Sequence, residues 1–476
     1  MALATARPIA DELDPQALVS DLIRRARRAM EAYENHDQDR IDDAVTALAW
    51  SIYKPEHATE LAELAVHDTG LGNVPSKITK NTRKIFGTLR DLVRERSTGV
   101  IEELPEKGLV KYAKPVGVVA AVCPSTNPAA TPVNKAMMAL KGGNAVVIAP
   151  SPAGYATTFR TVEHMRSELK KSGHPEDLVQ ILPAPVSKAL TQALMEASDL
   201  VVCTGSQNNG RRAYTSGTVA IGVGAGNVPV IIDSTAMLDD AAQKICASKI
   251  FDNSTSCSSE NALIILDDVY EDAIAALERA GGYRSRADEK QKIVETLWAD
   301  GHLNRHVIAK DADVFAEAAG LAEEARSRKF FVVEDDGIGP DHPLSDEKLS
   351  LVLTVYRATD FADAKDKVRR ILDVKGIGHS CGIHTSDMDH ARELAEDLDV
   401  VRVIVNQAHT FANGGSFDNG LNFTLSMGCG TWAGNSISEN LNYRHFINVT
   451  HLVTTIPEDK PSEEELFGAY WTRYGK

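Results

Sequence analysis

The sequence lacks any apolar run long enough to cross a bilayer. Its longest apolar stretches, such as residues 118–123 and 145–148, fall far short of the roughly 20 residues that a membrane helix needs. Residues 1–13 contain no basic region followed by an apolar core, so they do not read as a secretory signal peptide. We therefore expect no membrane association and take the cytoplasm as the default compartment.

Cysteines are sparse, and basic residues are outnumbered by acidic ones. Six cysteines in 476 residues, with no C-x-x-C pair, are too few for a disulfide scaffold and indicate buried thiols or one reactive thiol. Lys and Arg number 51 against 67 Asp and Glu, a net charge of −16, so the chain offers no general footprint for nucleic acid. A local basic pocket for a small phosphorylated ligand stays open.

The sequence also shows no metal-ligand spacing and no repeat of fixed period. The run HTSDMDH at residues 384–390 is interpreted as a turn that leads into a helix, so we expect no metal site. What is present is ordinary globular composition, with 43% apolar and 25% charged residues. The length of 476 residues exceeds what one core usually supports and predicts two or three lobes.

Two series of alternating strands and helices follow a helical entry region at residues 18–66. In the first series we expect strands at 118–123, 145–148, 178–182, 200–203 and 219–223, and helices at 132–141, 155–170, 188–196 and 208–216. The second series begins near Ala236, with strands expected at 262–266, 330–333, 351–356, 382–384 and 401–405. This alternation predicts an α/β protein with mostly parallel sheets covered on both faces.

Two further segments fit neither series. Residues 99–114 alternate apolar and charged side chains, which favours an edge hairpin used for assembly. The acidic residues 457–465 precede an aromatic patch, for which we expect docking on another subunit; it comprises Phe467, Tyr470, Trp471 and Tyr474.

The most informative stretch is FDNSTSCSSEN at residues 251–261, which places Cys257 among small polar residues between a predicted helix and a predicted strand. A thiol is nucleophilic only as the thiolate, so its pKa of about 8.5 must be lowered by local donors or by a positive partner. Small neighbours let backbone amides approach the sulfur. Cys257 is therefore a nucleophile candidate, whereas Cys123, Cys203 and Cys246 lie in or beside apolar runs and fit buried structural thiols.

Two loops at the carboxyl ends of predicted strands can hold ligands, because α/β proteins place ligands there. The first, PSTNP at residues 124–128, offers Asn127, whose amide can donate to an oxyanion; by itself Asn-Pro is more often an ordinary turn. The second, Thr204-Gly205-Ser206, caps a predicted helix and suits a phosphate. The glycine-rich run GVGAGN at residues 222–227 fails as a dinucleotide finger because a predicted strand follows it.

Taken together, these motifs resemble the aldehyde dehydrogenase superfamily, and specifically its CoA-acylating branch. The resemblance covers about residues 18–453 and rests on seven ordered segments: VVAAVCPSTNP, GNAVVIAPSP, GVGAGNVP, FDNSTSCSSE, EKLSLVLTVY, KGIGHS and GCGTWAGNSISEN. It implies two Rossmann-like three-layer lobes with a small oligomerisation hairpin. The implied parts are a cofactor-binding domain at 1–98 and 115–235 with 425–445, a catalytic domain at 236–424, and oligomerisation segments at 99–114 and 446–476.

The resemblance also implies a mechanism. Cys257 attacks the aldehyde, Asn127 and the Cys257 backbone N–H hold the oxyanion, and hydride transfer to NAD(P) leaves a thioester. Hydrolytic members carry a glutamate general base where this chain has Val223, so the thioester should survive until the thiol of CoA removes it. His379 matches a histidine of the acylating branch that positions or deprotonates CoA. Its alternative is a histidine that satisfies a turn.

For the cofactor, the resemblance implies contacts from ten residues: Ser125, Thr126, Ala149, Pro150, Ser151, Thr204, Gly205, Ser206, Gly224 and Glu347. Glu347 matches the glutamate that holds the nicotinamide ribose, with a solvated carboxylate as its alternative. Many members have Lys-Pro-Ser-Glu where this chain has Ala149-Pro150-Ser151-Pro152, so no acid is present there to repel a 2′-phosphate. The choice between NAD and NADP stays open.

Within the branch the chain resembles the acylating sulfoacetaldehyde dehydrogenases. A sulfonate is a permanent anion, and the polar side chains of Gln407, His409 and Thr410 are the expected substrate-binding residues, with an ordinary polar surface turn as the alternative for this loop. Arg211-Arg212 is a second cationic candidate, for which contact with CoA phosphates or with solvent stays open. Enzymes for acetaldehyde, propionaldehyde or succinate semialdehyde stay open as alternatives, as does a hydrolytic dehydrogenase. A catalytically idle scaffold is disfavoured by the joint presence of Cys257 and its partner residues. The family builds dimers or tetramers, so we expect a homo-oligomer.

Overall fold

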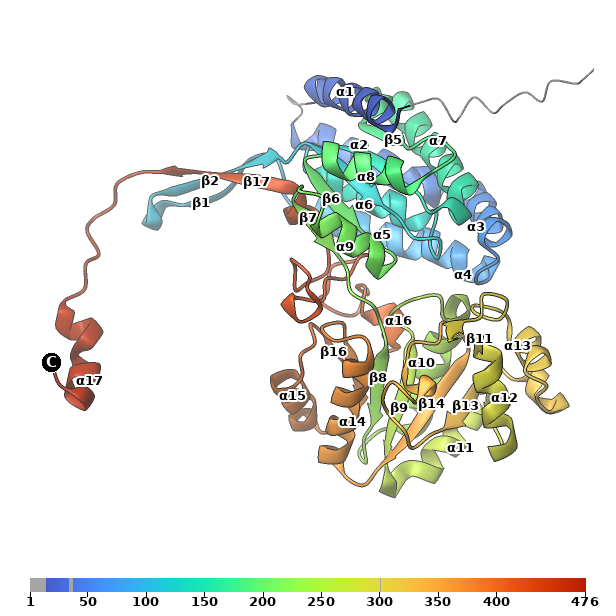
Figure 1. Ribbon diagram of the computed structural model, residues 1–476. Helices are drawn as coiled ribbons and strands as arrows, with labels where there is room; N and C mark the ends of the chain where they lie inside the picture. Colours follow the sequence, from blue (N-terminus) through green and yellow to red (C-terminus); the bar gives the residue numbers. More distant parts are fainter. Residues whose placement is uncertain (1–13, 34–36, 300) are drawn as a thin grey trace, which may run out of the picture.

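Figure 1 shows the computed structural model, which describes residues 14–33, 37–299 and 301–476. The chain forms two α/β lobes, one above the other in this view, and an arm that extends away from the first lobe. The signal-peptide prediction for residues 1–13 lies outside the described residues. Among the residues described, no helix is both long and apolar enough to span a membrane.

The first lobe is built on a five-stranded parallel sheet in the order β5-β4-β3-β6-β7. Its central strands β3 and β4 read VVAAV and AVVIA and are buried along their whole length, as expected for strands covered on both faces. The strands are β3 (Val118–Val122), β4 (Ala145–Ala149), β5 (Val179–Ile181), β6 (Leu200–Cys203) and β7 (Ala220–Gly222). All five lie where the sequence pattern predicts strands.

Helices cover both faces of this sheet. Helices α1 and α8 pack together on one face, and α2, α6 and α7 pack on the other, which confirms the predicted three-layer arrangement. The helices of this lobe are α1 (Pro15–Tyr33), α2 (Gln38–Tyr53), α3 (Pro55–Thr69), α4 (Val74–Thr79), α5 (Ile85–Val93), α6 (Ala130–Lys141), α7 (Tyr155–Lys171), α8 (Lys188–Ala197) and α9 (Gln207–Tyr214).

The second lobe contains a seven-stranded parallel sheet in the order β10-β13-β14-β9-β8-β15-β16. Helices α10 and α11 pack on one face and α14 on the other. The strands are β8 (Val228–Ile232), β9 (Glu260–Leu266), β10 (Gly282–Arg284), β13 (Phe330–Glu334), β14 (Val352–Ala358), β15 (Cys381–His384) and β16 (Val403–Val405). The helices are α10 (Leu238–Ile250), α11 (Tyr270–Ala280), α12 (Ala287–Leu297), α13 (Ala312–Ala318), α14 (Phe361–Val374), α15 (Met388–Asp397) and α16 (His409–Ala412), and a small hairpin pairs β11 (Trp298–Ala299) with β12 (His302–Leu303).

One boundary differs from the prediction. We expected the first lobe to extend to residue 235, but β8 pairs with β9 and β15 and so belongs to the second sheet. The chain changes sheets within the GVGAGN segment, between β7 and β8. The expectation that a strand follows this glycine-rich segment is confirmed. This strand, β8, pairs within the other lobe, because the neighbours of a strand in its sheet are not visible in the strand's own sequence pattern.

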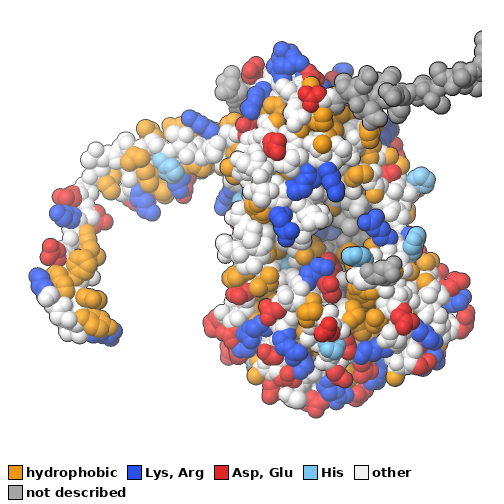
Figure 2. Space-filling view, in the orientation of Figure 1, with side chains coloured by type: hydrophobic (Ala, Val, Ile, Leu, Met, Phe, Trp, Pro, Cys, Tyr) orange, Lys and Arg blue, Asp and Glu red, His pale blue; other side chains and the backbone are white. Residues whose placement is uncertain are grey.

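The arm is an antiparallel three-stranded sheet in the order β1-β2-β17, made by β1 (Gly99–Leu104), β2 (Leu109–Pro115) and β17 (Ile447–Val453). The predicted hairpin at 99–114 is thereby confirmed as a hairpin. Beyond β17 the chain runs on to α17 (Glu463–Tyr474), which stands clear of both lobes and buries none of its side chains. Apolar side chains are exposed on this helix in Figure 2.

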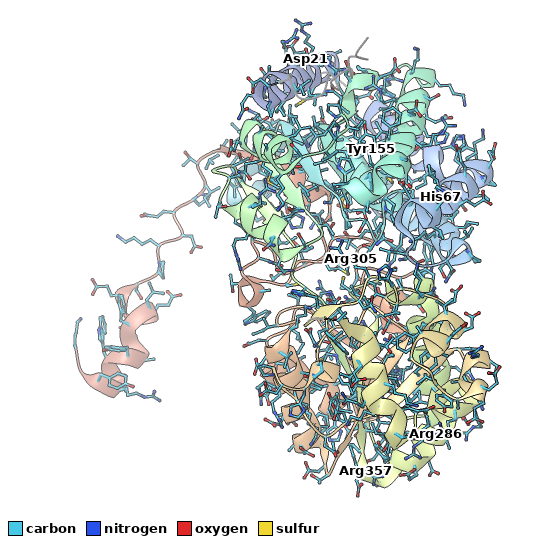
Figure 3. The ribbon with its side chains drawn as sticks, turned by 45° about the vertical axis from the view of Figure 1, so that its right-hand side comes forward. Asp21, His67, Tyr155, Arg286, Arg305 and Arg357 are labelled. Carbon is cyan, nitrogen blue, oxygen red and sulfur yellow. The ribbon has the colours of Figure 1, made fainter. Side chains whose placement is uncertain are left out.

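The two lobes meet through direct hydrogen bonds. Lys310 donates to the carbonyl of Gly70, and the amide of Gly72 donates to the carbonyl of Ala309. Arg305, labelled in Figure 3, lies at the same junction. Because the candidate site draws residues from both lobes, these contacts help to fix the distance between its parts.

Candidate active site

Cys257 lies at the start of β9 in a loop with an uncommon backbone. Three consecutive residues before it, Asp252, Asn253 and Ser254, have positive φ angles of 50°, 53° and 61°. This left-handed region costs a residue other than glycine of order 1–2 kcal/mol, so the loop must be held in place by its surroundings. The side chain of Asn253 donates to the Ala309 carbonyl and to Asp311, and the hydroxyl of Ser254 donates to the Lys249 carbonyl.

Asp252 is the main anchor of this loop. Its carboxylate is fully buried and accepts hydrogen bonds from Lys77 at 3.1 Å, Lys80 at 2.5 Å, the Thr255 hydroxyl at 2.7 Å and the backbone amide of Asn73 at 2.9 Å. Burial acts to raise the pKa of this carboxyl, but the charges of Lys80 and Lys77 and the Thr255 hydroxyl hold the pKa below its ordinary value. Since both lysines and Asn73 come from the first lobe, Asp252 ties the nucleophile loop to that lobe.

Of the six cysteines, Cys257 is the one that is partly exposed, and the other five are buried. Gly226 packs directly on it, because a Cβ at residue 226 would lie 2.0 Å from the Cys257 carbonyl oxygen. Burial of the sulfur, followed by the charge of Glu347, raises the pKa of the Cys257 thiol to about 12, with Ser258 and Arg402 acting in the opposite direction. The thiol is therefore protonated at neutral pH in the protein alone.

His379 lies at the start of β15 in the segment KGIGHS, with 1% of its surface exposed. Its Nδ1 is paired with the Ser380 hydroxyl at 2.8 Å, and its Nε2 is buried with no hydrogen-bond partner among the described residues. Burial and the neighbouring Arg402 and His409 hold its pKa well below the ordinary value, so the imidazole is neutral. An unpaired acceptor in the protein interior is costly, which favours a ligand that reaches it.

Arg402 joins the segments around the nucleophile, and sequence reasoning missed it. Its guanidinium is 5% exposed and donates to the carbonyls of His379 and Gly428 at 2.9 Å and to the side chain of Asn440 at 3.0 Å. It comes just before β16 as the one charged side chain in the apolar run VVRVIV of residues 400–405. That position indicates a buried neighbourhood, but it does not reveal which groups the guanidinium binds.

Cys429 fills the space between the glycines of this region. A Cβ at Gly224 would lie 2.8 Å from its Sγ, and a Cβ at Gly378 would lie 2.0 Å from its carbonyl oxygen. The segments that begin at residues 222, 376 and 428 therefore meet backbone to backbone around the nucleophile. Each of these close approaches needs a glycine.

The predicted cofactor residues of the first lobe gather at the carboxyl edge of its sheet. Strand β3 lies between β4 and β6, so the strand order reverses beside it, which is the usual position for a dinucleotide in this fold. Residues 125–127 follow β3 and are half-buried, 149–151 close β4, and 204–206 follow β6. Thr204 pairs with the Ser426 hydroxyl at 2.6 Å. Ser206 caps α9 by accepting from the Asn209 amide, as predicted.

The side chain of Glu347 is mostly buried, unlike that of a solvated carboxylate. Its side chain is 12% exposed, and Lys375 lies 3.6 Å from it and 3.1 Å from Asp346. Burial raises the pKa of Glu347 to about 7, with Lys375 acting in the opposite direction. Lys375 belongs to the same segment as His379, so that segment contributes to two parts of the site.

The predicted substrate residues lie beside the nucleophile loop, and two of them are buried. His409 is 1% exposed and its Nδ1 is 2.9 Å from the Ser258 carbonyl, while its backbone amide donates to Glu260. Thr410 is 5% exposed with its hydroxyl unpaired among the described residues. Gln407 is half-buried and accepts from Asn419. The structure thus places His409 in contact with Ser258, the residue after Cys257. Arg212, from the second cationic candidate, donates instead to the Lys188 carbonyl on the first lobe.

Four cations on one helical segment were also missed by sequence reasoning: Lys77, Lys80, Arg83 and Lys84. They line the side of this segment that faces Asp252 and residues 411–423. Their spacing is a possible signal, because basic residues at i, i+3, i+6 and i+7 occupy one helical face. Such a face ordinarily predicts a solvated surface. Within the described part of the chain, no group of three or more His, Cys, Asp or Glu side chains is placed to hold a metal ion.

Comparisons with known proteins identify the family and the fold. The profile of the aldehyde dehydrogenase family matches residues 11–292. An acylating sulfoacetaldehyde dehydrogenase of Cupriavidus necator is 51% identical over 96% of this chain and 93% of that protein, and one of Bilophila wadsworthia is 42% identical over 96% and 99%. The crystal structure of an acetylating aldehyde dehydrogenase from Geobacillus thermoglucosidasius has a TM-score of 0.91 at 32% identity, covering 96% of this chain and 100% of that one.

The fold of two parallel-sheet lobes around a cysteine loop, together with these matches, defines the class. The chain belongs to the aldehyde dehydrogenase family. Within it, the chain falls in the CoA-acylating branch, as both the relatives and the resemblance of its motifs indicate. The predicted fold class is confirmed.

Proposed function

We propose that the protein oxidises sulfoacetaldehyde to its acyl-CoA with NAD(P)⁺, through a thioester on Cys257. The observation that carries this proposal is the nucleophile loop. It presents the one partly exposed cysteine, against Gly226, in a site whose neighbouring segment 222–227 contains no carboxylate. Relatives at 51% and 42% identity that are named for this aldehyde support the substrate.

In this mechanism the Cys257 thiol gives its proton to solvent, its sulfur bonds to the aldehyde carbon, and the carbonyl π bond breaks to give a tetrahedral oxyanion. Asn127, half-buried at the end of β3, is the side-chain donor for that oxyanion, with the backbone amide of Cys257 as its partner. Because burial and Glu347 disfavour the thiolate, the protein alone keeps the nucleophile protonated and unreactive until its ligands arrive.

The residues at the carboxyl edge of the first sheet fit a dinucleotide. Small side chains at 149–151 leave room beside β4, and Ser206 caps α9, so that the N-terminal end of this helix can favour a phosphate. The bound cofactor supplies a positive charge and the acceptor for the hydride that the tetrahedral adduct loses. Glu347 is assigned to the nicotinamide ribose. No acid stands at 149–152, so both NAD and NADP fit this edge.

Release of the product requires a second nucleophile. Val223 has no proton-accepting atom, so it cannot activate water against the thioester. The thiol of CoA attacks the thioester carbon, the Cys257 thiolate leaves, and acyl-CoA departs. His379, with a neutral ring and an unpaired Nε2, is assigned to accept the proton of the CoA thiol.

We assign the cytoplasm as the compartment and a homo-oligomer as the working form, with the arm and α17 as its contact segments. The exposed apolar face of α17 supports that assignment, since Leu466 and Tyr474 are 64% and 66% exposed.

The test is an assay of NAD(P)H formation by the purified protein with sulfoacetaldehyde, acetaldehyde, propionaldehyde and succinate semialdehyde, each with and without CoA. We expect strict dependence on CoA, the highest kcat/KM with sulfoacetaldehyde, and the acyl-CoA as the product by mass spectrometry. A free acid as the main product, formed at the same rate without CoA, would overturn the acylating mechanism. A different best aldehyde would overturn the substrate alone.

A further inference from the structure

The two donors assigned to the oxyanion come from different lobes. Asn127 follows β3 of the first sheet, and the backbone N–H of Cys257 lies in the loop before β9 of the second sheet. An oxyanion hole works only if its donors keep hydrogen-bond distance to one oxygen atom, about 2.7–3.1 Å. The site therefore needs a connection that fixes the Asn127 loop relative to the nucleophile loop.

One ammonium group makes this connection. The Nζ of Lys77, on α4, donates to the Thr126 carbonyl at 3.2 Å and to the Asp252 carboxylate at 3.1 Å. The first acceptor belongs to the loop of Asn127, and the second belongs to the loop of Cys257. Because Lys77 is only 4% exposed, water competes little for these two bonds.

On the oxyanion side, the bond acts on the backbone that carries Asn127. The Thr126 carbonyl and the Asn127 nitrogen belong to one planar peptide group, so a fixed carbonyl also fixes the position of the Asn127 Cα. The Asn127 side chain is half-buried and has no hydrogen-bond partner among the described residues. Its amide is therefore directed by the backbone rather than by a bond of its own.

On the nucleophile side, the bond acts through Asp252 on the residues just before Cys257. The carboxylate that accepts from Lys77 also accepts from the Thr255 hydroxyl at 2.7 Å. Lys80 bonds both groups, at 2.5 Å to the carboxylate and 2.9 Å to the hydroxyl. Both of these partners lie on the nucleophile loop, so Lys80 holds that side, whereas Lys77 connects the two sides.

The packing around Lys77 leaves little free space. A cavity of about 10 Å³, which has room for one water molecule at most, is lined by Lys77, Lys80, Asn81, Asn127 and small apolar side chains. Lys77 and Asn127 thus lie on the walls of the same small space. Loss of the bonds that the ammonium makes would let the Asn127 loop move into that space.

We propose that Lys77 is a positioning residue, which holds the Asn127 amide and the Cys257 backbone N–H at the separation that one oxyanion requires. This inference rests on the proposed function, because that function assigns both donors to the same oxygen. A tetrahedral oxyanion forms twice in that reaction, when the Cys257 sulfur attacks the aldehyde and when CoA attacks the thioester. Lys77 therefore acts in both half-reactions, unlike His379, which is assigned to the second one only.

The test is a double-mutant cycle in the rate of NAD(P)H formation during the first turnover, with Lys77→Met and Asn127→Ala. Methionine keeps the length of the side chain and removes the ammonium. We expect Lys77→Met to slow the first turnover about 30-fold or more, because a donor misplaced by about 1 Å loses most of its effect. In the Asn127→Ala background the same change should slow it less than about threefold, since the donor to be positioned is gone. Equal losses in both backgrounds would overturn the inference.

Further variants separate positioning from stability. Lys77→Arg keeps a charged donor, so its loss should be smaller than that of Lys77→Met. Lys141→Met is the matched control, since Lys141 is also buried and bonds a carboxylate, that of Asp42, at 2.5 Å, but it lies at the far end of α6. We expect both methionine variants to lower the midpoint of urea unfolding, and Lys141→Met to change the first turnover less than about twofold. Equally slow first turnovers in the two variants would assign the effect to lost stability.

A substitute variant and the choice of aldehyde keep the two proposals distinguishable. If Lys77→Met does not fold, Lys77→Gln, which keeps a donor without the charge, takes its place in the cycle. The cycle uses the aldehyde that the wild-type enzyme oxidises fastest, because every aldehyde forms the same oxyanion on Cys257. A best aldehyde other than sulfoacetaldehyde, or turnover without CoA, would overturn the proposed function and leave the cycle readable. Strict CoA dependence with an additive cycle would overturn the role of Lys77 alone.

Discussion

The two parallel sheets contribute to the site with opposite ends. In the first lobe the site residues follow their strands: Asn127 comes after β3, and Thr204 after β6. In the second lobe they precede their strands: Cys257 comes before β9, and His379 before β15. Loops after parallel strands are the usual ligand sites of α/β folds, whereas loops before them are not.

This difference corresponds to a division of roles, with most of the predicted cofactor residues in the first lobe and the nucleophile in the second. The first lobe needs only small residues and a capped helix at a sheet edge, which many sequences supply. The second lobe holds its nucleophile in a loop with three left-handed residues, and the loop's own buried carboxylate, Asp252, is anchored by two lysines from the opposite side of the junction. Strain of this kind persists only where the surroundings fix it, so the reacting lobe depends on contacts that the binding lobe provides.

The largest expected effect comes from removing the nucleophile. Cys257→Ala should lower turnover of any aldehyde by at least about 10⁴-fold, because no covalent intermediate can form. Steady-state NAD(P)H formation measures this directly. Cys246→Ala is the control, since that thiol is buried and donates to the Ala280 carbonyl, away from the site. A Cys257→Ala enzyme with substantial cofactor-dependent oxidation would remove the nucleophile from this account.

The next effect concerns the anchor of the strained loop. Asp252→Asn should lower the free energy of unfolding by about 3–5 kcal/mol, because two buried lysines lose their carboxylate. Urea denaturation followed by circular dichroism measures the loss. Asp240→Asn is the matched control, since its pair with Lys244 is exposed and should contribute at most about 1 kcal/mol. Similar losses in the two variants would mean that the loop is not held by Asp252.

A smaller effect separates the two half-reactions. His379→Ala should slow CoA-dependent release about 10- to 100-fold and leave the first burst of NAD(P)H nearly intact, since the imidazole is assigned to the second step only. Stopped-flow absorbance resolves the burst from the steady state. Equal losses in both phases would show that His379 supports the nucleophile itself.

The smallest effect is a pH dependence of stability at Lys84. Burial, followed by Arg83 and Lys80, lowers the pKa of Lys84 in the folded protein to about 7, from an ordinary 10.5. The unfolded chain therefore binds more protons between about pH 7 and pH 10.5, and the folded state gains stability as pH rises through that window. Lys84→Met removes this titration. The difference in unfolding free energy between wild type and Lys84→Met should change by about 2 kcal/mol from pH 6 to pH 9. A constant difference would mean that Lys84 is not titrating near neutrality.

Much of the scaffold was predictable because local patterns determine it. The uninterrupted apolar runs of β3 and β4 predict strands buried on both faces, and Ser206 predicts the start of α9. The assignment of β8 to the second sheet was not predictable, because strand neighbours are set by long-range pairing. Cys257 could be selected from its small polar neighbours, but its partner segments around Gly224 and Cys429 followed only from the family resemblance.

The cations were unpredictable for a different reason. Lys77, Lys80 and Lys84 resemble a solvated helix face in sequence, and only the buried Asp252 and the carbonyls of Gly414 and Gly415 show that they point inward. Arg402, just before β16, likewise gives no sign in the sequence of the carbonyls that it binds. Polar side chains that bond to residues far away in the chain leave no periodic pattern in the sequence, and the site contains many such side chains.

The central claim is that the thioester on Cys257 waits for CoA. The most direct measurement mixes the enzyme with sulfoacetaldehyde and NAD(P)⁺ without CoA and counts the NAD(P)H formed per active site. The account predicts a burst of one equivalent or less that then stops and resumes on addition of CoA. Continued turnover without CoA would contradict it, because water would then be activated by a group other than Val223.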